Sequence, residues 1–282
     1  APRNMIGAAA GLTLPLDTKF VTEWFACFQK HANGCGEQAL SSIIWAISCL
    51  NIKPPLSFWS VFCNCLEKNA PLSAQSISVI FWACARMQLN PPAFLVNSLG
   101  EIAASHRFGD VRGQGLANII WSLSKLQIYP TSDFMQHWYS RFLALNDMNP
   151  RELNAVVWAF GRLDLKPSHE VVNHCIVQSL KARGRFTLRQ LASVMRSLTK
   201  LSSSMRSHDN VYLLAEAGIP LFPSADLLSL VAYLDALARL GLKPNPGILK
   251  EWVKELKKRD VDVESKRAIE SSLQNMGIRP KS

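Results

Sequence analysis

One phrase recurs along this chain, and its clearest copy reads Leu116-Ala117-Asn118-Ile119-Ile120-Trp121-Ser122-Leu123-Ser124-Lys125-Leu126, with Pro130 four residues later. Three other copies keep both the tryptophan and the proline, and three weaker copies keep the closing apolar residue. The closing residues of the seven copies are Leu50, Met87, Leu126, Leu163, Leu201, Leu240 and Met276, which lie 37, 39, 37, 38, 39 and 36 residues apart. Self-similarity at a period of roughly 20 to 50 residues is typical of solenoids and other repeat arrays.

Each copy of the phrase has the apolar spacing of an amphipathic helix. In the fourth copy the apolar residues are Leu153, Val156, Val157, Phe160 and Leu163, and most of them fall on one broad stripe. The following proline is expected to end this first helix and to lie in the first turn of a second one. The expected second helices are Leu56–Lys68, Ala93–Ser105, Asp133–Leu145, His169–Lys181 and Pro246–Lys258, and 17–32 is expected to be an unpaired second helix that caps the array.

Neither helix of a repeat can bury its apolar stripe alone, so the helical hairpins must stack on one another. The sequence therefore predicts an all-α fold, an α-solenoid of about six to seven tandem helix-turn-helix repeats of roughly 38 residues. We expect an N-terminal extension over 1–16 and a single solenoid domain over 17–282, because no break in composition marks a further boundary. Hydrophobic residues make up 48% of the chain without an uncharged run long enough to span a membrane, so no membrane partner is expected.

The chain is basic. Lys and Arg number 31 against 21 Asp and Glu, which gives a formal net charge of +10. This excess favours a polyanionic partner such as RNA or an anionic membrane face. The alternative is a protein that is basic throughout, so the position of the cations must decide between these interpretations.

The seven cysteines lie mostly within apolar helical phrases, which favours reduced thiols over a disulfide framework. Cys63 and Cys65 are separated by one residue, which is closer than the usual spacing of zinc ligands, and no second pair follows. We therefore expect no metal ion and no other cofactor.

The strongest candidate binding feature is a polar ridge on the first helix of each repeat. Residues seven before, three before and four after the tryptophan position fall within about 40° of one another on a helical wheel, roughly opposite the apolar stripe. At the position four residues after the tryptophan, five of six repeats carry a cation. The candidate RNA-binding residues of this ridge are Arg86, Lys125, Arg162, Lys200 and Arg239, with Gln38, Gln75, Gln114, Asn118, Arg151 and Arg189.

Stacked repeats would present these side chains as ladders, in which Lys and Arg neutralise phosphates while amides meet sugar hydroxyls or base edges. The alternative is that a cation in the last helical turn only complements the helix dipole. The repeated tryptophans, which are Trp45, Trp82, Trp121 and Trp158, also lie near the ridge. We expect them to pack between neighbouring helices, and stacking on unpaired bases is the alternative.

A second cationic group is predicted in the turns that lead from one repeat to the next. Its members are Arg107, Arg112, Lys181, Arg183 and Arg185. These turns are expected to share one edge of the solenoid, where they could grip a duplex or a neighbouring strand by its phosphates. A solvated loop is the alternative.

The phrase from Leu116 to Leu126, its proline and its period resemble the octotricopeptide repeat, and are similar to the 37-residue repeats of RAP-domain proteins. The resemblance covers nearly the whole chain and is strongest from Gln38 to Leu180. It implies a right-handed solenoid and an organellar RNA-binding protein, since members of the family act on transcript stability, splicing, translation or ribosome assembly in algae, plants and protists. Departures are Arg196 and Asp235 at the tryptophan position, and Met205 in place of the fifth proline.

No catalytic constellation accompanies the repeats, because the sequence lacks a nucleophile elbow and a His-Glu metal helix. We therefore expect a non-catalytic protein without a small-molecule substrate. The leading hypothesis is a component of a mitochondrial ribosome that binds and stabilises ribosomal RNA, with ribosomal proteins as further partners. The alternatives are a free organellar factor for transcript stability, processing or translation, which would bind messenger RNA, and a protein-binding scaffold.

The expected location is the mitochondrion, and the chloroplast is the alternative. The sequence begins Ala1-Pro2-Arg3-Asn4, as a chain would after removal of a transit peptide.

Overall fold

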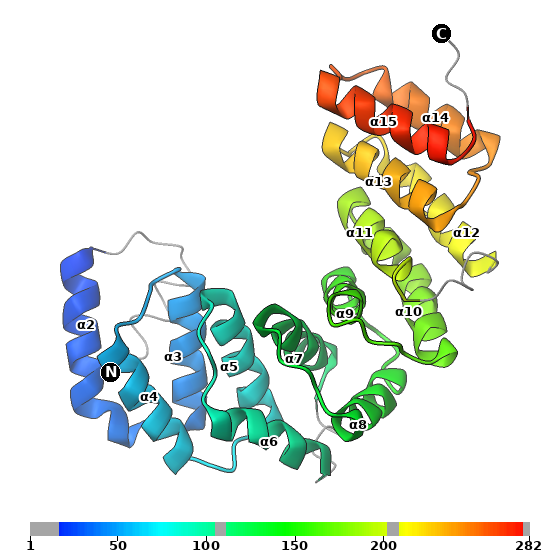
Figure 1. Ribbon diagram of the computed structural model, residues 1–282. Helices are drawn as coiled ribbons and strands as arrows, with labels where there is room; N and C mark the ends of the chain where they lie inside the picture. The colour runs from blue at the N-terminus through cyan, green and yellow to red at the C-terminus, as the bar shows by residue number, and fades with distance from the viewer. Residues whose placement is uncertain (1–16, 105–110, 202–208, 279–282) are drawn as a thin grey trace. The chain divides into compact units, whose positions relative to one another are not determined.

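The computed structural model describes residues 17–104, 111–201 and 209–278, and within these ranges the chain is helical without strands (Figure 1). The predicted extension over 1–16 lies outside the described residues. Among the helices that are described, none is both long and apolar enough to cross a membrane. The predicted all-α class is thus confirmed.

Two sets of helices alternate along the chain, and we call the first helix of each repeat an A helix and the second a B helix. The A helices are α3 (Glu37–Cys49), α5 (Ala74–Met87), α7 (Gly113–Leu126), α9 (Pro150–Arg162), α11 (Leu188–Leu198), α13 (Leu227–Leu240) and α15 (Val263–Asn275). The B helices are α2 (Thr18–His31), α4 (Leu56–Lys68), α6 (Ala93–Ala104), α8 (Ser132–Leu143), α10 (His169–Lys181), α12 (Asp209–Glu216) and α14 (Pro246–Leu256). Short 3-10 turns lie at η1 (Ala32–Gly34), η3 (Arg183–Arg185) and η5 (Ile219–Leu221).

The period of the sequence is the period of the structure. The first residues of successive A helices are 37, 39, 37, 38, 39 and 36 residues apart, the same steps that separate the closing apolar residues. Two expected B helices, α4 and α10, have the predicted bounds, whereas α8 differs by one residue at its start and two at its end, and α14 ends two residues early. Helix α6 begins at Ala93 as predicted, and its predicted last residue, Ser105, lies outside the described residues. Asp17 caps α2 by accepting a hydrogen bond from the Lys19 amide.

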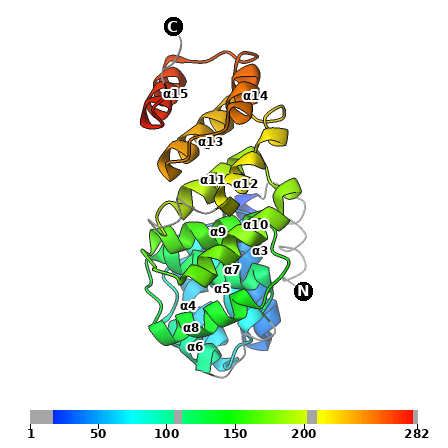
Figure 2. The same cartoon turned by 90° about the vertical axis from the view of Figure 1, so that its right-hand side faces the viewer.

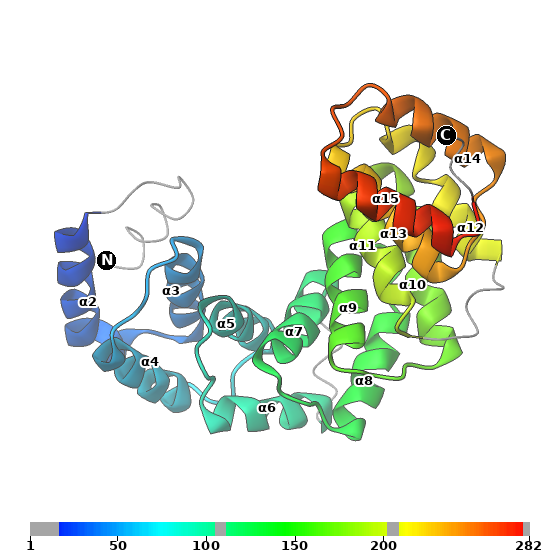
Figure 3. The same cartoon turned by 45° about the horizontal axis from the view of Figure 1, so that its top comes forward.

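The chain divides into two compact units, Ala1–Phe142 and Leu143–Ser282. In the first unit α3 packs on α5, α5 packs on α7, and α2 packs on α4 (Figure 3). In the second unit α9, α11, α13 and α15 pack in that order (Figure 2). This packing of A helices in sequence order is the arrangement of an α-solenoid, as predicted. The single domain over 17–282 stays a prediction.

Buried tryptophans on B helices join the two helices of a repeat. Trp138 on α8 and Trp252 on α14 are both buried, and their indole N–H groups donate to the carbonyl oxygens of Leu116 and Leu230 at 3.3 and 3.0 Å. Each acceptor lies 22 residues earlier, on the preceding A helix. The bond satisfies the polar atom that a buried indole would otherwise leave without a partner.

The A helices end differently from the prediction, which attributed their ends to proline. In six repeats the residue after the closing apolar position is left-handed, with φ between 51° and 71°: Asn51, Gln88, Gln127, Asp164, Gly241 and Gly277. The amide that follows bonds back to the carbonyl five residues earlier, as from Leu89 to Cys84 and from Ile128 to Leu123, both at 2.9 Å. This is a Schellman motif, and it ends the helix before the proline is reached.

The proline also lies outside the second helix. Pro54, Pro167 and Pro244 each stand two residues before the first residue of a B helix, and the residue between them is the N-cap. The expectation that proline occupies the first turn of the B helix is therefore wrong, and its fixed φ instead shapes the short connection before the cap.

Candidate nucleic-acid interface

The five predicted cations of the ridge are all exposed. Arg86 and Lys125 lie in the last turns of α5 and α7 in the first unit. In the second unit Arg162 and Arg239 end α9 and α13, and Lys200 lies in the turn after α11. The polar side chains near the start of the same helices are Gln38, Gln75, Gln114, Arg151 and Arg189, which are exposed, and Asn118, which is half-buried.

Three of these cations lie over the indole of their own helix. The distances from the cationic centre to the ring centroid are 5.4 Å for Arg86 over Trp82, 5.7 Å for Lys125 over Trp121 and 5.4 Å for Arg162 over Trp158. All three tryptophans are half-buried, and each indole is covered by a cation. The ridge thus contains two cation and indole pairs in the first unit and one in the second.

Two cations also reach the preceding A helix. The Nε–H of Arg86 donates to the carbonyl of Ser48, at the end of α3, at 2.9 Å. A Cβ added to Gly161 would lie 3.1 Å from the Cδ of Lys200, so the lysine stem runs across α9. These side chains complement the negative end of a neighbouring helix. A guanidinium has five N–H donors, and the contact between Arg86 and Ser48 uses one of them.

Arg239 differs from the other cations of the ridge. Its Nε donates to both carboxylate oxygens of Asp235, at 2.9 and 2.7 Å, and Asp235 stands where earlier repeats have tryptophan. The positive charge in this repeat is therefore offset by a carboxylate four residues earlier. Arg239 is exposed, and its ion pair with Asp235 weakens its attraction for a phosphate.

Grooves between successive A helices bring the other ridge positions together. Between α3 and α5 lies a groove of about 570 Å³, and between α11 and α13 lies a second of about 210 Å³. Equivalent repeat positions line both grooves. On the first A helix these are the tryptophan position and the residues seven, four and three before it. On the next A helix they are the residues seven and three before its own tryptophan position. The first contains Gln38, Ser41, Ser42, Trp45, Gln75 and Val79, and the second contains Arg189, Ala192, Ser193, Arg196, Leu228 and Ala232.

The two grooves differ in charge. The α3–α5 groove is lined by amides, hydroxyls and one indole, with Glu37 at its edge. The α11–α13 groove carries two guanidinium groups, Arg189 and Arg196. Arg196 was not among the predicted site residues, although its presence at the tryptophan position was a visible signal. Of the predicted ridge residues, Gln38 and Gln75 line the first groove and Arg189 lines the second, whereas the cations four residues after the tryptophan position are not among the residues that line either groove.

The predicted edge group is only partly available to a ligand. Arg107 lies outside the described residues. Arg112, Lys181 and Arg183 are exposed. Arg185 pairs with Asp147 at 2.9 Å and donates to the carbonyl of Met148, which ties two successive turns of the second unit together.

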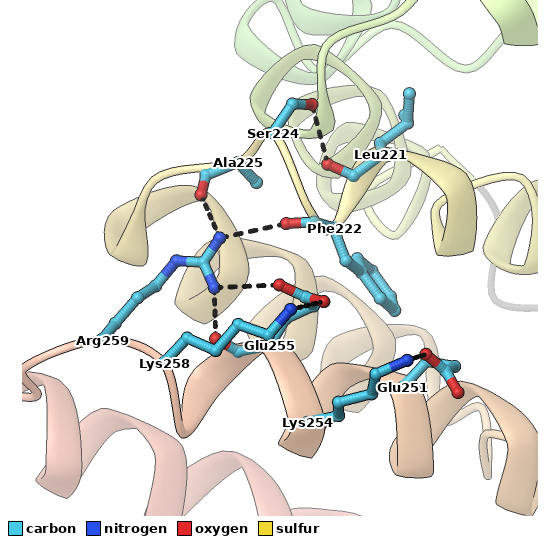
Figure 4. A network of polar contacts seen from close by, with 9 residues as sticks. All are labelled: Leu221, Phe222, Ser224, Ala225, Glu251, Lys254, Glu255, Lys258 and Arg259. Atoms are coloured by element: carbon cyan, nitrogen blue, oxygen red, sulfur yellow. Dashed lines mark hydrogen bonds and ion pairs between the residues drawn. The ribbon is translucent and has the colours of Figure 1, made fainter.

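A matching tie lies two repeats later, where Arg259 follows α14 (Figure 4). Its guanidinium donates to the carbonyls of Phe222 and Ala225, at 3.1 and 2.7 Å, and pairs with the buried carboxylate of Glu255. Hydrogen bonding from Lys258 and Arg259 holds the pKa of Glu255 below its ordinary value. Arg259 is therefore structural, since it joins the end of α14 to the turn before α13.

Burial lowers the reactivity of two cysteine thiols, Cys63 and Cys175. None of the seven cysteines forms a disulfide within the described residues, and burial raises the pKa of Cys63 to about 11 and that of Cys175 to about 12. A thiol with so high a pKa is a poor nucleophile at neutral pH. No group of three or more metal-ligating side chains occurs in the ranges that the structure describes.

Comparison with known proteins places the chain among helical-repeat factors. The family model described as the Tbc2 translation factor, N-terminal domain, matches residues 95–247, which is just over half of the chain. The match runs from α6 to the first residues of α14 and so includes parts of both units. A comparison with curated proteins finds no match.

Proposed function

This chain belongs to the family of the Tbc2 translation factor N-terminal domain, and from that premise we propose that it is a non-catalytic RNA-binding protein that acts in organellar translation. The observation that carries the proposal is the recurrence of exposed cations and amides on one face of successive A helices, beside half-buried indoles and inter-helix grooves. Cations that recur at the repeat period suit a polymer whose charges also recur.

The chemistry of the ridge fits single-stranded RNA. Arg86 and Lys125 in one unit, and Arg162 and Lys200 in the other, would neutralise phosphates, while the amides and hydroxyls of the grooves would meet base edges and 2′-hydroxyl groups. Arg239 would contribute less, because Asp235 offsets its charge. We also infer that the repeats are of the octotricopeptide type, on the strength of their phrase and period.

Two roles in translation compete. A factor that acts on messenger RNA is the one we favour, because the matching family is described as a translation factor. Binding to ribosomal RNA as a component of a mitochondrial ribosome is the other, and it loses support because Arg185 in the edge group is engaged in an ion pair. Sedimentation of the tagged protein decides between them, since a structural component stays with mature ribosomal subunits and a free factor does not.

We propose the mitochondrion as the site of action, with the chloroplast as the alternative. A fluorescent fusion made at the native locus and expressed in the protein's own cell type tests this. Signal that coincides with neither organelle would contradict an organellar role.

The central experiment measures RNA affinity against salt concentration. Reversing Arg86, Lys125, Arg162 and Lys200 to Glu should weaken binding of a single-stranded RNA of about 12 nucleotides. It should also reduce the magnitude of the slope of log K against log salt by about 3, because each lost phosphate contact changes the slope by about 0.7. Circular dichroism confirms that the variant is folded.

The matched control reverses four exposed lysines away from the ridge, Lys53, Lys243, Lys250 and Lys257. The control has the same net charge as the ridge variant, so long-range attraction changes equally in both. If the two variants lose affinity and slope alike, the ridge does not hold phosphates and only the overall charge matters. If the native protein binds no RNA, the protein-binding scaffold becomes the better interpretation.

A further inference from the structure

We infer that the groove between α3 and α5 is a nucleobase site, in which one unpaired base stacks on the indole of Trp45. This inference rests on the proposed RNA-binding function and assigns a distinct task to one groove of the first unit. It concerns a contact with the base, whereas the ridge cations concern the phosphates.

Trp45 differs from the three other repeated tryptophans. It is 40% exposed, whereas Trp82, Trp121 and Trp158 are half-buried. Each of those three has a cation over its ring at 5.4 to 5.7 Å. The residue four after Trp45 is Cys49, so the side chain that covers the other indoles is missing in this repeat. An uncovered indole face next to a groove is what stacking on a base requires.

The walls of the groove suit the edges of a base. Gln38 and Gln75 are exposed, and within the described part of the chain their amides make no hydrogen bond. A side-chain amide offers donors and an acceptor together, as the edge of a base does. Val79 adds an apolar surface from α5, and the groove volume of about 570 Å³ falls in the usual range of small-molecule sites, roughly 300 to 1,000 Å³.

The charge of the groove favours a base over a phosphate. No Lys or Arg lines it, and its one carboxylate, Glu37, accepts a hydrogen bond from the backbone amide of Ser73 at 2.8 Å. A phosphate would meet no cation there and would lie near a negative charge. The α11–α13 groove has the opposite character, since Arg189 and Arg196 stand at positions equivalent to Gln38 and Trp45.

The test compares two probes that carry the same backbone charge. One is a single-stranded RNA of about 12 nucleotides with randomised sequence, and the other is the abasic ribose-phosphate chain of equal length. The native protein should bind the RNA more tightly than the abasic chain. Trp45→Leu should reduce affinity for the RNA by about fivefold to a hundredfold, which is the range for the loss of one stacked base, and leave affinity for the abasic chain unchanged. Trp45→Phe should restore most of the loss, because phenylalanine also stacks.

A second variant blocks the proposed base site by covering the indole of Trp45, which stays in place. Cys49→Arg supplies a guanidinium four residues after Trp45, the spacing at which Arg86 covers Trp82 and Arg162 covers Trp158. The covered ring should lower the preference for RNA over the abasic chain, while affinity for the abasic chain stays equal or rises. This variant keeps the inference testable if Trp45→Leu fails to fold.

The outcomes separate this inference from the proposed function. If the native protein binds RNA with a steep salt dependence but Trp45→Leu and Cys49→Arg both keep the full preference for RNA over the abasic chain, the base site is wrong and the phosphate ridge stands. If the native protein binds neither probe, both proposals fail together.

Discussion

Arg86 on α5 donates its Nε–H to the carbonyl of Ser48 on α3 at 2.9 Å, so the cation of one repeat closes the end of the helix before it. We expect Arg86→Met to lower the free energy of unfolding by about 0.5 to 1.5 kcal/mol, the usual contribution of one hydrogen bond. Urea denaturation measures this. Arg151→Met removes the same charge from the first turn of α9, where a cation opposes the helix dipole, and should not destabilise the protein.

We expect Trp252 on α14 to stabilise the fold through its N–H hydrogen bond as well as through its buried volume. Trp252→Phe removes the indole donor to the Leu230 carbonyl, and one hydrogen bond contributes about 0.5 to 1.5 kcal/mol. Thermal unfolding should show a clear fall in Tm. Trp59→Phe makes the same change at a half-buried position on α4, and a fall as large there would mean that ring size alone is responsible.

Gly218 is predicted to exclude any side chain. A Cβ at this position would lie 2.6 Å from Cε2 of Tyr233, whose buried hydroxyl donates to the carbonyl of Ala215 at 2.5 Å. Since Tyr233 cannot move without breaking that bond, Gly218→Ala should destabilise the protein by about 1 to 3 kcal/mol. Gly184→Ala, where a Cβ meets nothing within 4 Å, is the control, and equal losses in both variants would contradict the steric explanation.

Glu255 should make the stability of the protein depend on pH in the acidic range. Hydrogen bonds from Lys258 and Arg259 hold its pKa below the ordinary 4.5. A carboxyl whose pKa is lower in the folded state stabilises the fold above its unfolded pKa, and that contribution is lost as the pH falls through the folded pKa. The difference in Tm between the native protein and Glu255→Gln should therefore be largest near neutral pH and shrink below pH 4.5.

A control for this prediction is Glu270→Gln, which changes an exposed carboxylate on α15. It should leave the Tm close to that of the native protein at every pH. A difference between the native protein and Glu255→Gln that stays constant down to strongly acidic pH would show that the loss is steric rather than ionic.

Much of the fold could be predicted because each repeat follows from local patterns in the sequence. The apolar stripe and its period placed the A helices, and α4 and α10 have the predicted bounds. The helix ends were misassigned because proline is a familiar signal, whereas the left-handed residue is Asn51, Gln88 or Asp164 in some repeats and glycine only later in the chain. The recurrence of Asn, Gln, Asp or Gly after the closing apolar residue was nevertheless visible in the sequence.

The candidate site was predicted less fully, because its decisive contacts join residues of different repeats. A helical wheel places Gln38 and Trp45 on one face, but it does not show that Gln75 of the next helix closes the same groove. The grouping of cations in the turns likewise gave Arg185 the same standing as Lys181, although Asp147, 38 residues earlier in the chain, pairs with Arg185. That pairing depends on how the helices stack, whereas Asp235 stands four residues before Arg239 on the same helix, so their ion pair was visible in the sequence.

The shared left-handed turn at the end of the A helices makes the array modular. Gln88 and Gln127 have φ of 57° and 56°, so excising 89–127 would join two ends that already have the same backbone geometry. The shortened chain would keep the repeat period of 36 to 39 residues between the starts of successive A helices. Evolution can therefore trim or extend this protein by whole periods without inventing a new junction.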